Sequence, residues 1–142
     1  MPRGEMKWSL VKNMKCTGYE KYGTWLIQYG FPSGIQDNGV PYSGTHRTAY
    51  VPDTPEGREV IALLVKAFER RHTFIVGTSV TTGQQNCVVW SGIHHKTNTC
   101  GGATHFGFPD YTYFNRVKLE MADRGVLLES QDEIDRVVNQ KQ

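Results

Sequence analysis

The chain has 142 residues, of which 38% are hydrophobic, and this is enough to bury the core of one domain without metal or disulfide bonds. Its 16 lysines and arginines against 14 aspartates and glutamates give a net charge of +2, too small to indicate binding to nucleic acid or a membrane surface. We therefore expect one domain, in which any anionic ligand is held by local geometry and not by overall charge.

The cysteines and the N-terminus indicate an intracellular protein. Cys16, Cys87 and Cys100 form no CxxC pair and are odd in number, which is typical of reduced thiols. The N-terminus lacks the apolar core of a signal peptide, and no stretch approaches the ~18 apolar residues that a membrane-spanning helix requires. We expect a cytoplasmic or nuclear protein without disulfides and without a membrane partner.

The first regular elements are predicted to be strands. Residues 24–31 (TWLIQYGF) are rich in aromatic and β-branched residues, and residues 46–51 (HRTAYV) form a second such run. The residues between them are dense in glycine, proline and asparagine, which indicates a long surface loop. This loop is expected to lie within the domain and not to link two domains.

A long helix is predicted directly after the second strand. Thr54 can cap its N-terminus, and Pro55 can occupy the first helical position, whose backbone amide needs no partner. Apolar residues then recur at spacings of three and four up to about Arg71, while charged residues occupy the other faces. One stripe of this helix is therefore expected to pack on a sheet.

Strands and a second helix are predicted in the later part of the chain. Residues 72–77 and 87–90 are short apolar runs joined by a glycine-containing loop, which predicts two antiparallel strands. A shorter helix is predicted from near Asp110 to Arg124, with Gly125 as its C-terminal cap.

The last residues form a separate short element. Residues 128–142 contain a capping box of Ser130 with Glu133, followed by apolar residues at helical spacing, and such a short helix needs a surface to dock against. Together the elements predict an α+β fold, in which residues 1–127 form a single compact domain with antiparallel sheet segments packed against one long and one shorter helix. Residues 128–142 are then an amphipathic helical tail.

Four stretches of the sequence together carry a resemblance to a known family. They are GTHRTAYVPDTPEGREV (44–60), FIVGTSVTTG (74–83), VVWSGIHHKT (88–97) and GGATHFGFPDYTYFNRVKLEM (101–121). In order and spacing they resemble the Deltex C-terminal domain, and the similarity extends from about residue 2 to about Val126. None of these motifs would suffice alone.

The resemblance implies that this domain is one part of a larger ubiquitin ligase. Deltex proteins are ubiquitin ligases in which a zinc-binding RING domain directly precedes this module. The RING recruits a ubiquitin-charged conjugating enzyme, while the C-terminal domain holds ADP-ribose or NAD, so that ubiquitin is transferred to a ribose hydroxyl. This sequence contains no RING-type series of cysteines and histidines, and we do not expect it to act as a ligase alone.

A polar loop between the two short strands is a candidate phosphate-binding segment. Gly77, Thr78, Ser79 and Thr81 offer backbone amides and hydroxyls that could surround a pyrophosphate. The alternative is an ordinary hairpin loop, because glycine and threonine are common in turns. The resemblance favours the ligand-binding interpretation.

Two adjacent histidines follow the last of these strands. Neighbouring side chains of an extended segment point to opposite sides, so His94 and His95 are not expected to bind one metal ion together. A zinc site from His94, Cys100 and His105 fits no common ligand spacing, and we expect no metal. The resemblance implies that His94 contacts the nucleotide, together with His105 and Phe106, which leaves His95 as a structural residue.

Two further side chains each have two interpretations. The guanidinium of Arg47 could bind a diphosphate through two parallel hydrogen bonds, or it could form a salt bridge at a sheet edge. Trp90 could stack on an adenine, but a large aromatic residue at the end of an apolar run is more often part of the core. The choice stays open for Arg47, and we favour the core for Trp90.

The resemblance also indicates where acid–base chemistry would occur. Glu120 matches the family's catalytic glutamate, which is thought to act as a general base on the ribose hydroxyl. Without the family, a surface pair with Arg116 or Arg124, each four residues away, is the simpler interpretation. Relatives have histidine or tyrosine where this sequence has Phe106, whose ring can stack but forms no equivalent hydrogen bond; neighbouring His105 could take that role.

These observations predict a module that binds ADP-ribose or NAD, either free or attached to a protein or nucleic acid, with no further cofactor. One alternative is a protein-interaction domain that has kept the fold and lost the ligand. Another is the substrate-holding half of an active ligase, with a RING protein and a ubiquitin-charged conjugating enzyme as its partners.

Overall fold

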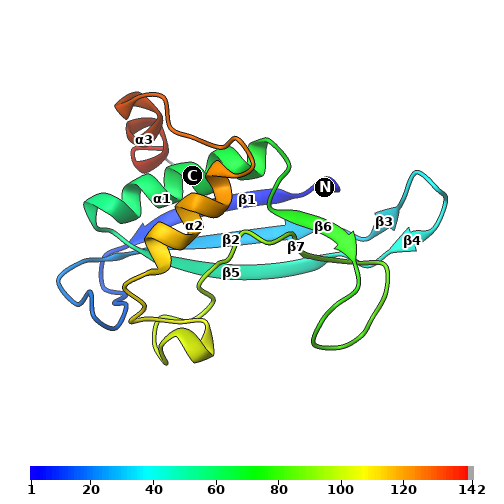
Figure 1. Ribbon diagram of the computed structural model, residues 1–142, viewed down its shortest axis with the longest axis horizontal. Helices are drawn as coiled ribbons and strands as arrows, with labels where there is room; N and C mark the ends of the chain where they lie inside the picture. The colour runs from blue at the N-terminus through cyan, green and yellow to red at the C-terminus, as the bar shows by residue number, and fades with distance from the viewer. Residues whose placement is uncertain (141–142) are drawn as a thin grey trace.

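An antiparallel sheet with helices on one face is the base of the structure, a computed structural model that describes residues 1–140 (Figure 1). The elements in chain order are β1 (Glu5–Val11), β2 (Thr24–Phe31), β3 (Gly34–Ile35), β4 (Pro41–Tyr42), β5 (Thr45–Pro52), α1 (Pro55–Glu69), β6 (Phe74–Gly77), β7 (Cys87–Trp90), a 3₁₀ turn (Ala103–His105), α2 (Tyr113–Ala122) and α3 (Gln131–Val138). The predicted α+β class with antiparallel sheet segments is confirmed. No helix within residues 1–140 is long and apolar enough to cross a membrane.

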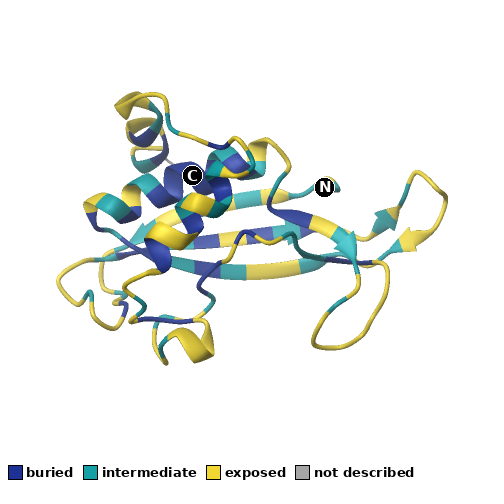
Figure 2. Cartoon of the chain, in the orientation of Figure 1, coloured by how far each residue is buried: buried dark blue, intermediate teal, exposed yellow. Residues whose placement is uncertain are grey.

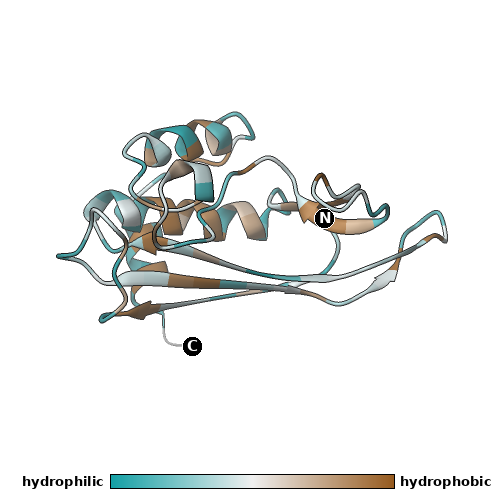
Figure 3. Cartoon of the chain, turned by 90° about the horizontal axis from the view of Figure 1, so that it is seen from below, coloured by the Kyte–Doolittle hydropathy of each residue, from teal (hydrophilic) through white to brown (hydrophobic). Residues whose placement is uncertain are grey.

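The main sheet has the strand order β1-β2-β5, and the central strand β2 supplies much of its buried face. Trp25, Ile27, Tyr29 and Phe31 alternate along β2 and are all buried, as the period of two in a strand requires. Hydrophobic residues gather between α1 and this face, while the other face is more exposed (Figures 2 and 3).

The edge strand β1 was not predicted from the sequence. Among its seven residues only Trp8 is buried, because charged and polar residues such as Glu5 and Ser9 face solvent. Polar and apolar residues nevertheless alternate from Glu5 to Leu10, as expected for a strand with one face toward the core, so the signal for this strand was present in the sequence. The predicted surface loop between β2 and β5 also contains the short β3–β4 pair, which projects from the body of the molecule (Figure 1).

Helix α1 begins as the sequence predicted. Thr54 Oγ1 accepts a hydrogen bond of 2.9 Å from Gly57 N, and Pro55 is the first helical residue. The helix ends at Glu69, two residues before the predicted end, because Arg70 caps it and Arg71 adopts a left-handed backbone with φ +64°.

The segment from β7 to Lys96 runs beside β5 and in the same direction. Val88 N donates to Ser43 O (3.0 Å) at one end of this track, and Tyr50 N donates to Lys96 O (2.9 Å) at the other. The strand β6 pairs only with β7, and it begins at Phe74, two residues after the predicted start. The segment from β7 to Lys96 thus brings His94 and His95 to the edge of the main sheet.

Helix α2 begins at Tyr113, three residues after the predicted start, because Asp110 is used elsewhere. Lys96 Nζ, almost fully buried, donates to Asp110 Oδ2 at 2.7 Å, and Thr112 N bonds the other carboxylate oxygen. Burial alone would raise the pKa of Asp110, but the hydrogen bonds from Lys96 and Thr112 lower it. Gly125, with φ +74°, turns the chain away from the helix as predicted, and Val126 N donates to Met121 O (2.9 Å).

Helix α3 lies against α1 near the edge strand. Trp8 Nε1 donates to the carbonyl of Val137 (2.9 Å), and Lys66 of α1 forms an ion pair with Glu133 (2.7 Å). The predicted cap by Ser130 is wrong: its side chain makes no capping hydrogen bond. Glu133 does reach back: its carboxylate accepts from Glu129 N (2.6 Å). The pKa of Glu133 is lowered by the bond from Lys66 and also by hydrogen bonds with the backbone of Glu129 and Ser130, so the glutamate half of the capping box forms.

Candidate functional site

His94 and Glu120, which lie 26 residues apart in sequence, meet at the surface between α2 and the segment after β7. The Nδ1 atom of His94 lies 2.5 Å from Glu120 Oε2, and the backbone amide of His94 donates to Oε1 at 2.9 Å. The carboxylate therefore holds one residue through both its ring and its backbone. The predicted surface pair of Glu120 with Arg116 or Arg124 is wrong, since neither guanidinium bonds this carboxylate.

The ring of His94 remains open on its other side. Its side chain is 65% exposed, whereas that of Glu120 is 24% exposed. The Nε2 atom has no hydrogen-bond partner within residues 1–140. When Nδ1 donates its proton to the carboxylate, Nε2 of a neutral ring is an acceptor. The arrangement thus presents an oriented acceptor to an incoming hydroxyl.

His95 is buried behind this surface and is structural, as the sequence predicted. Nδ1 lies 2.8 Å from the carbonyl of Ile93 and Nε2 lies 2.7 Å from the hydroxyl of Tyr29. A carbonyl only accepts, so Nδ1 carries the proton and Nε2 accepts from Tyr29. Burial lowers the pKa of His95 from 6.5 to about 4, which keeps the ring neutral at physiological pH.

Trp90 belongs to an aromatic cluster under the site. Its indole stacks on the ring of His95, with centroids 4.3 Å apart, and on Phe74 of the paired strand at 4.5 Å. Tyr29 meets the same indole edge-on at 5.8 Å. Trp90 is thus partly buried and packs against the core, in the direction of the favoured interpretation.

Arg47 lies on β5 directly opposite Tyr29, so its side chain points to the same face of the sheet. The side chain is exposed, and Nη1 donates to the carbonyl of the preceding residue, His46, at 2.7 Å. No carboxylate within residues 1–140 pairs with it, so the alternative of a salt bridge at a sheet edge is not formed. Its guanidinium is therefore accessible on the side of the sheet that carries His95.

The polar loop after β6 is closed by its own hydrogen bonds. Gly83 N donates to Ser79 O and Ser79 N donates to Gln84 O, both at 2.9 Å, and Ser79 Oγ lies 3.2 Å from Thr81 Oγ1. Gly77, at the start of this loop, pairs with Cys87, whereas Trp90 lies at the other end of the hairpin. Three residues of strand separate these ends by about 10 Å. Gly77, Thr78, Ser79 and Thr81 thus cluster with one another and not with His94.

Phe106 and His105 lie in one turn that is attached to the segment after His94. The carbonyl of Phe106 accepts from Thr97 N at 2.9 Å, and Thr97 follows His94 by three residues, about 10 Å of extended chain. Phe106 has a left-handed backbone with φ +55°, and its side chain is 64% exposed. The ring is available for stacking, and His105 beside it is also exposed.

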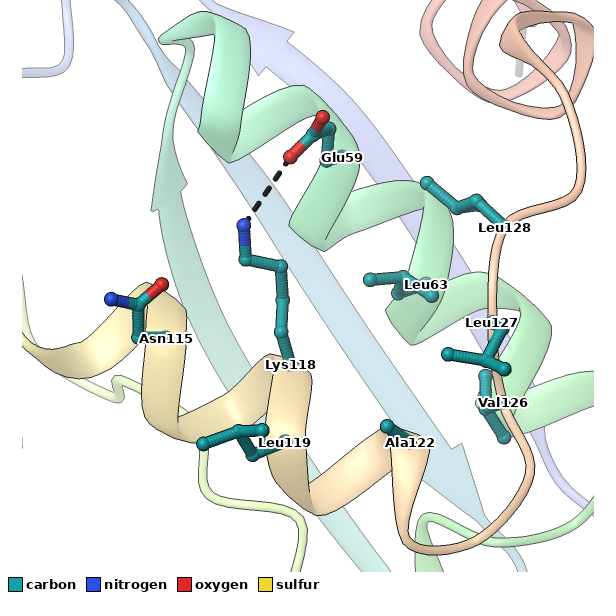
Figure 4. A pocket seen from close by; sticks show the side chains of 9 residues that line it. All are labelled: Glu59, Leu63, Asn115, Lys118, Leu119, Ala122, Val126, Leu127 and Leu128. Atoms are coloured by element: carbon teal, nitrogen blue, oxygen red, sulfur yellow. Dashed lines mark hydrogen bonds and ion pairs between the residues drawn. The ribbon is translucent and has the colours of Figure 1, made fainter.

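A groove of about 550 Å³ lies on a different face of α2 (Figure 4). Leu63 of α1, Leu119 and Ala122 of α2 and the following chain at Leu127 and Leu128 line it. Glu120 is not among its lining residues, so this groove is separate from the His94–Glu120 contact. Within residues 1–140 no three or more histidine, cysteine, aspartate or glutamate side chains lie together in a way that could hold a metal ion.

The sequence comparisons agree with the motifs around this surface. A family model of the Deltex C-terminal domain matches residues 1–126. The chain belongs to the Deltex C-terminal domain family. The resemblance carried by the four motif stretches is therefore confirmed.

Curated relatives of this Deltex C-terminal domain are ubiquitin ligases by name. Probable E3 ubiquitin-protein ligase DTX3 of Homo sapiens is 48% identical over 128 residues, 87% of this chain and 37% of the relative. E3 ubiquitin-protein ligase DTX1 of Xenopus laevis is 39% identical over 135 residues, 90% of this chain and 22% of the relative. E3 ubiquitin-protein ligase DTX4 of Mus musculus is 36% identical over 132 residues, 88% of this chain and 21% of the relative. The Deltex C-terminal domain described here thus spans 37% or less of each of these relatives.

Two residues that hold the site were not predicted from the sequence of this Deltex C-terminal domain. The hydroxyl of Tyr113 donates to the carbonyl of His94 at 2.8 Å. Arg124 bonds the carbonyls of Glu120 and Ser91 at 2.9 and 3.0 Å. Only the four-residue spacing from Glu120 hinted at a role for Arg124, and it suggested the wrong atoms.

The buried neutral state of His95 predicts a pH-dependent stability. Between pH 4 and 6.5 the unfolded chain binds a proton on this residue and the folded chain does not, so the free energy of unfolding falls as the pH falls. The expected slope is about 1.4 kcal/mol per pH unit, with this contribution complete above about pH 6.5. Urea unfolding across this range measures it. His95→Gln should flatten the slope while His105→Gln retains it, and a wild-type stability constant from pH 6.5 to 4 would contradict the assignment.

Proposed function

We propose that this domain binds ADP-ribose or NAD on the surface where His94 meets Glu120. The observation that carries the proposal is the exposed imidazole whose Nδ1 is held 2.5 Å from a carboxylate. A ribose hydroxyl suits the free Nε2 atom, because a hydroxyl donates one hydrogen bond and accepts others. Membership of the family to which this chain belongs supports the same surface.

The phosphates of such a ligand would lie toward Arg47. Its guanidinium is exposed on the same sheet face as Tyr29 and carries donors that suit phosphate oxygens. The bond from Arg47 to the carbonyl of His46 is a local contact that a phosphate can replace. In this proposal Phe106 stacks on a ring of the ligand, and the loop of Gly77, Thr78, Ser79 and Thr81 is the most distant part of the site.

In a longer Deltex protein the bound nucleotide would be the acceptor of ubiquitin. Each oxygen of the Glu120 carboxylate has a second lone pair beyond the one that His94 engages. A ribose hydroxyl within reach can transfer its proton there and attack the thioester carbonyl of a ubiquitin-charged conjugating enzyme that a RING domain recruits. The bond from ubiquitin to the ribose oxygen then forms as the carbon–sulfur bond breaks and the cysteine thiolate of the conjugating enzyme leaves. The relatives named as E3 ubiquitin-protein ligases support this role.

The binding proposal predicts a loss of affinity when His94 is truncated. His94→Ala should weaken ADP-ribose binding by about 1 to 3 kcal/mol, because a hydrogen bond to the ligand is lost. His46→Ala is the matched control, since this exposed histidine lies next to Arg47 and on the opposite face of the strand. Calorimetry measures both. Wild-type protein that does not bind ADP-ribose at millimolar concentration would refute the proposed function.

The catalytic part of the proposal predicts that Phe106 limits the rate. A phenyl ring cannot orient the ribose hydroxyl toward Glu120, and loss of one positioned acid or base costs about a hundredfold. Phe106→His should therefore accelerate ubiquitin transfer to ADP-ribose when the domain is fused to a Deltex RING. Histidine is well tolerated at the positive φ of this residue.

The adjacent histidine provides the competing explanation. If His105 already fills the role, the fused wild-type domain is fully active, His105→Ala abolishes transfer and Phe106→His adds nothing. If instead Phe106 limits the rate, Glu120→Gln in the Phe106→His background removes the recovered activity.

A further inference from the structure

Arg124 joins the end of α2 to the segment that carries His94. Its Nη1 atom donates to the carbonyl of Glu120 at 2.9 Å, and its Nη2 atom donates to the carbonyl of Ser91 at 3.0 Å. One guanidinium therefore spans the two elements from which the carboxylate and the imidazole of the site project. The side chain is partly buried and does not bond the Glu120 carboxylate or the His94 ring.

The backbone next to Ser91 is shaped to admit this guanidinium. Gly92 has φ +110°, a conformation that side chains other than glycine rarely adopt. A Cβ atom at this position would lie 2.7 Å from Arg124 Nη2. A glycine here thus serves both the turn of the chain and the close approach of the arginine.

The contacts of α2 separate the effect of Arg124 from the packing of the helix. Val117 and Met121 are fully buried in the core, and the Tyr113 hydroxyl bonds the carbonyl of His94 near the start of the helix. These contacts hold α2 on the domain when Arg124 is removed. Arg124 in addition fixes the distance between the backbone of Glu120 and that of Ser91, three residues before His94.

We propose that Arg124 is a positioning residue, which sets Glu120 at hydrogen-bonding distance from both His94 atoms without touching the ligand. The part of this inference that concerns the ligand rests on the function proposed above. The planar fork of an arginine reaches two carbonyls at once, whereas a lysine ammonium is a point charge on a flexible stem. Lysine is therefore not expected to replace it.

The test uses the isolated chain, with two readouts. The first is the amide proton of His94 in ¹H–¹⁵N spectra, which reports its bond to Glu120 Oε1. In Arg124→Ala and Arg124→Lys we expect this resonance to move toward its position in Glu120→Ala. The second is calorimetry with ADP-ribose, in which both variants should bind about tenfold more weakly, as expected for the loss of one well-oriented hydrogen bond.

Arg70→Ala is the matched control. Arg70 also donates to a backbone carbonyl at the end of α2, that of Gly125 at 3.1 Å, but it is exposed and bonds neither Glu120 nor Ser91. We expect both readouts to stay at wild-type values in this variant.

The two readouts distinguish the failure of this inference from the failure of the proposed function. A His94 resonance that is unmoved in Arg124→Ala overturns the positioning role, whatever the ligand does. A displaced resonance with unchanged ADP-ribose affinity overturns its relevance to binding. If the wild-type domain does not bind ADP-ribose but the resonance moves as expected, the proposed function fails and the structural role of Arg124 stands.

Discussion

His95 is held inside the protein by two hydrogen bonds, and the orientation of the candidate site follows from them. The carbonyl of Ile93 and the hydroxyl of Tyr29 engage both ring nitrogens, and Trp90 stacks on the ring. Because neighbouring side chains of an extended segment point to opposite sides, burial of His95 places His94 at the surface. Burial of a protonated His95 would be costly, so these contacts of His95 depend on its ring staying neutral.

Helix α2 then completes the arrangement from the other side. Its buried residues fix it on the core, the Tyr113 hydroxyl bonds the His94 carbonyl, and Glu120 engages the His94 ring and amide. The site is therefore made by two elements that are distant in sequence and are joined through polar contacts at their interface. Precise placement of this kind, supported by residues outside the site, is what binding and catalysis require.

The sequence predicted most of the regular elements, and it misplaced boundaries that depend on tertiary contacts. The start of α1 followed from Thr54 and Pro55, and β2 from its aromatic and β-branched residues. The start of α2 was misplaced because Asp110 is bonded to the buried Lys96, a contact that no local pattern reveals. Edge strand β1 was missed although polar and apolar residues alternate from Glu5 to Leu10, a pattern typical of a strand at the edge of a sheet.

The site itself was only partly predictable. The family resemblance selected His94 and Glu120 separately, but their contact spans 26 residues and has no local signal. The i to i+4 spacing suggested that Glu120 pairs with an arginine on its own helix. In the structure the carboxylate of Glu120 bonds His94, and Arg124 bonds the backbone carbonyl of Glu120. Side-chain direction, which depends on tertiary packing, decided between these alternatives.

The most direct test of the account is a titration of the ¹⁵N-labelled domain with ADP-ribose, followed by ¹H–¹⁵N spectra. If the nucleotide binds where His94 meets Glu120, the largest shifts will occur at His94, Glu120 and Phe106, with smaller shifts at Arg47. Shifts confined to the separate groove at Leu119 and Leu127 (Figure 4), or spectra that do not change, would contradict the central claim.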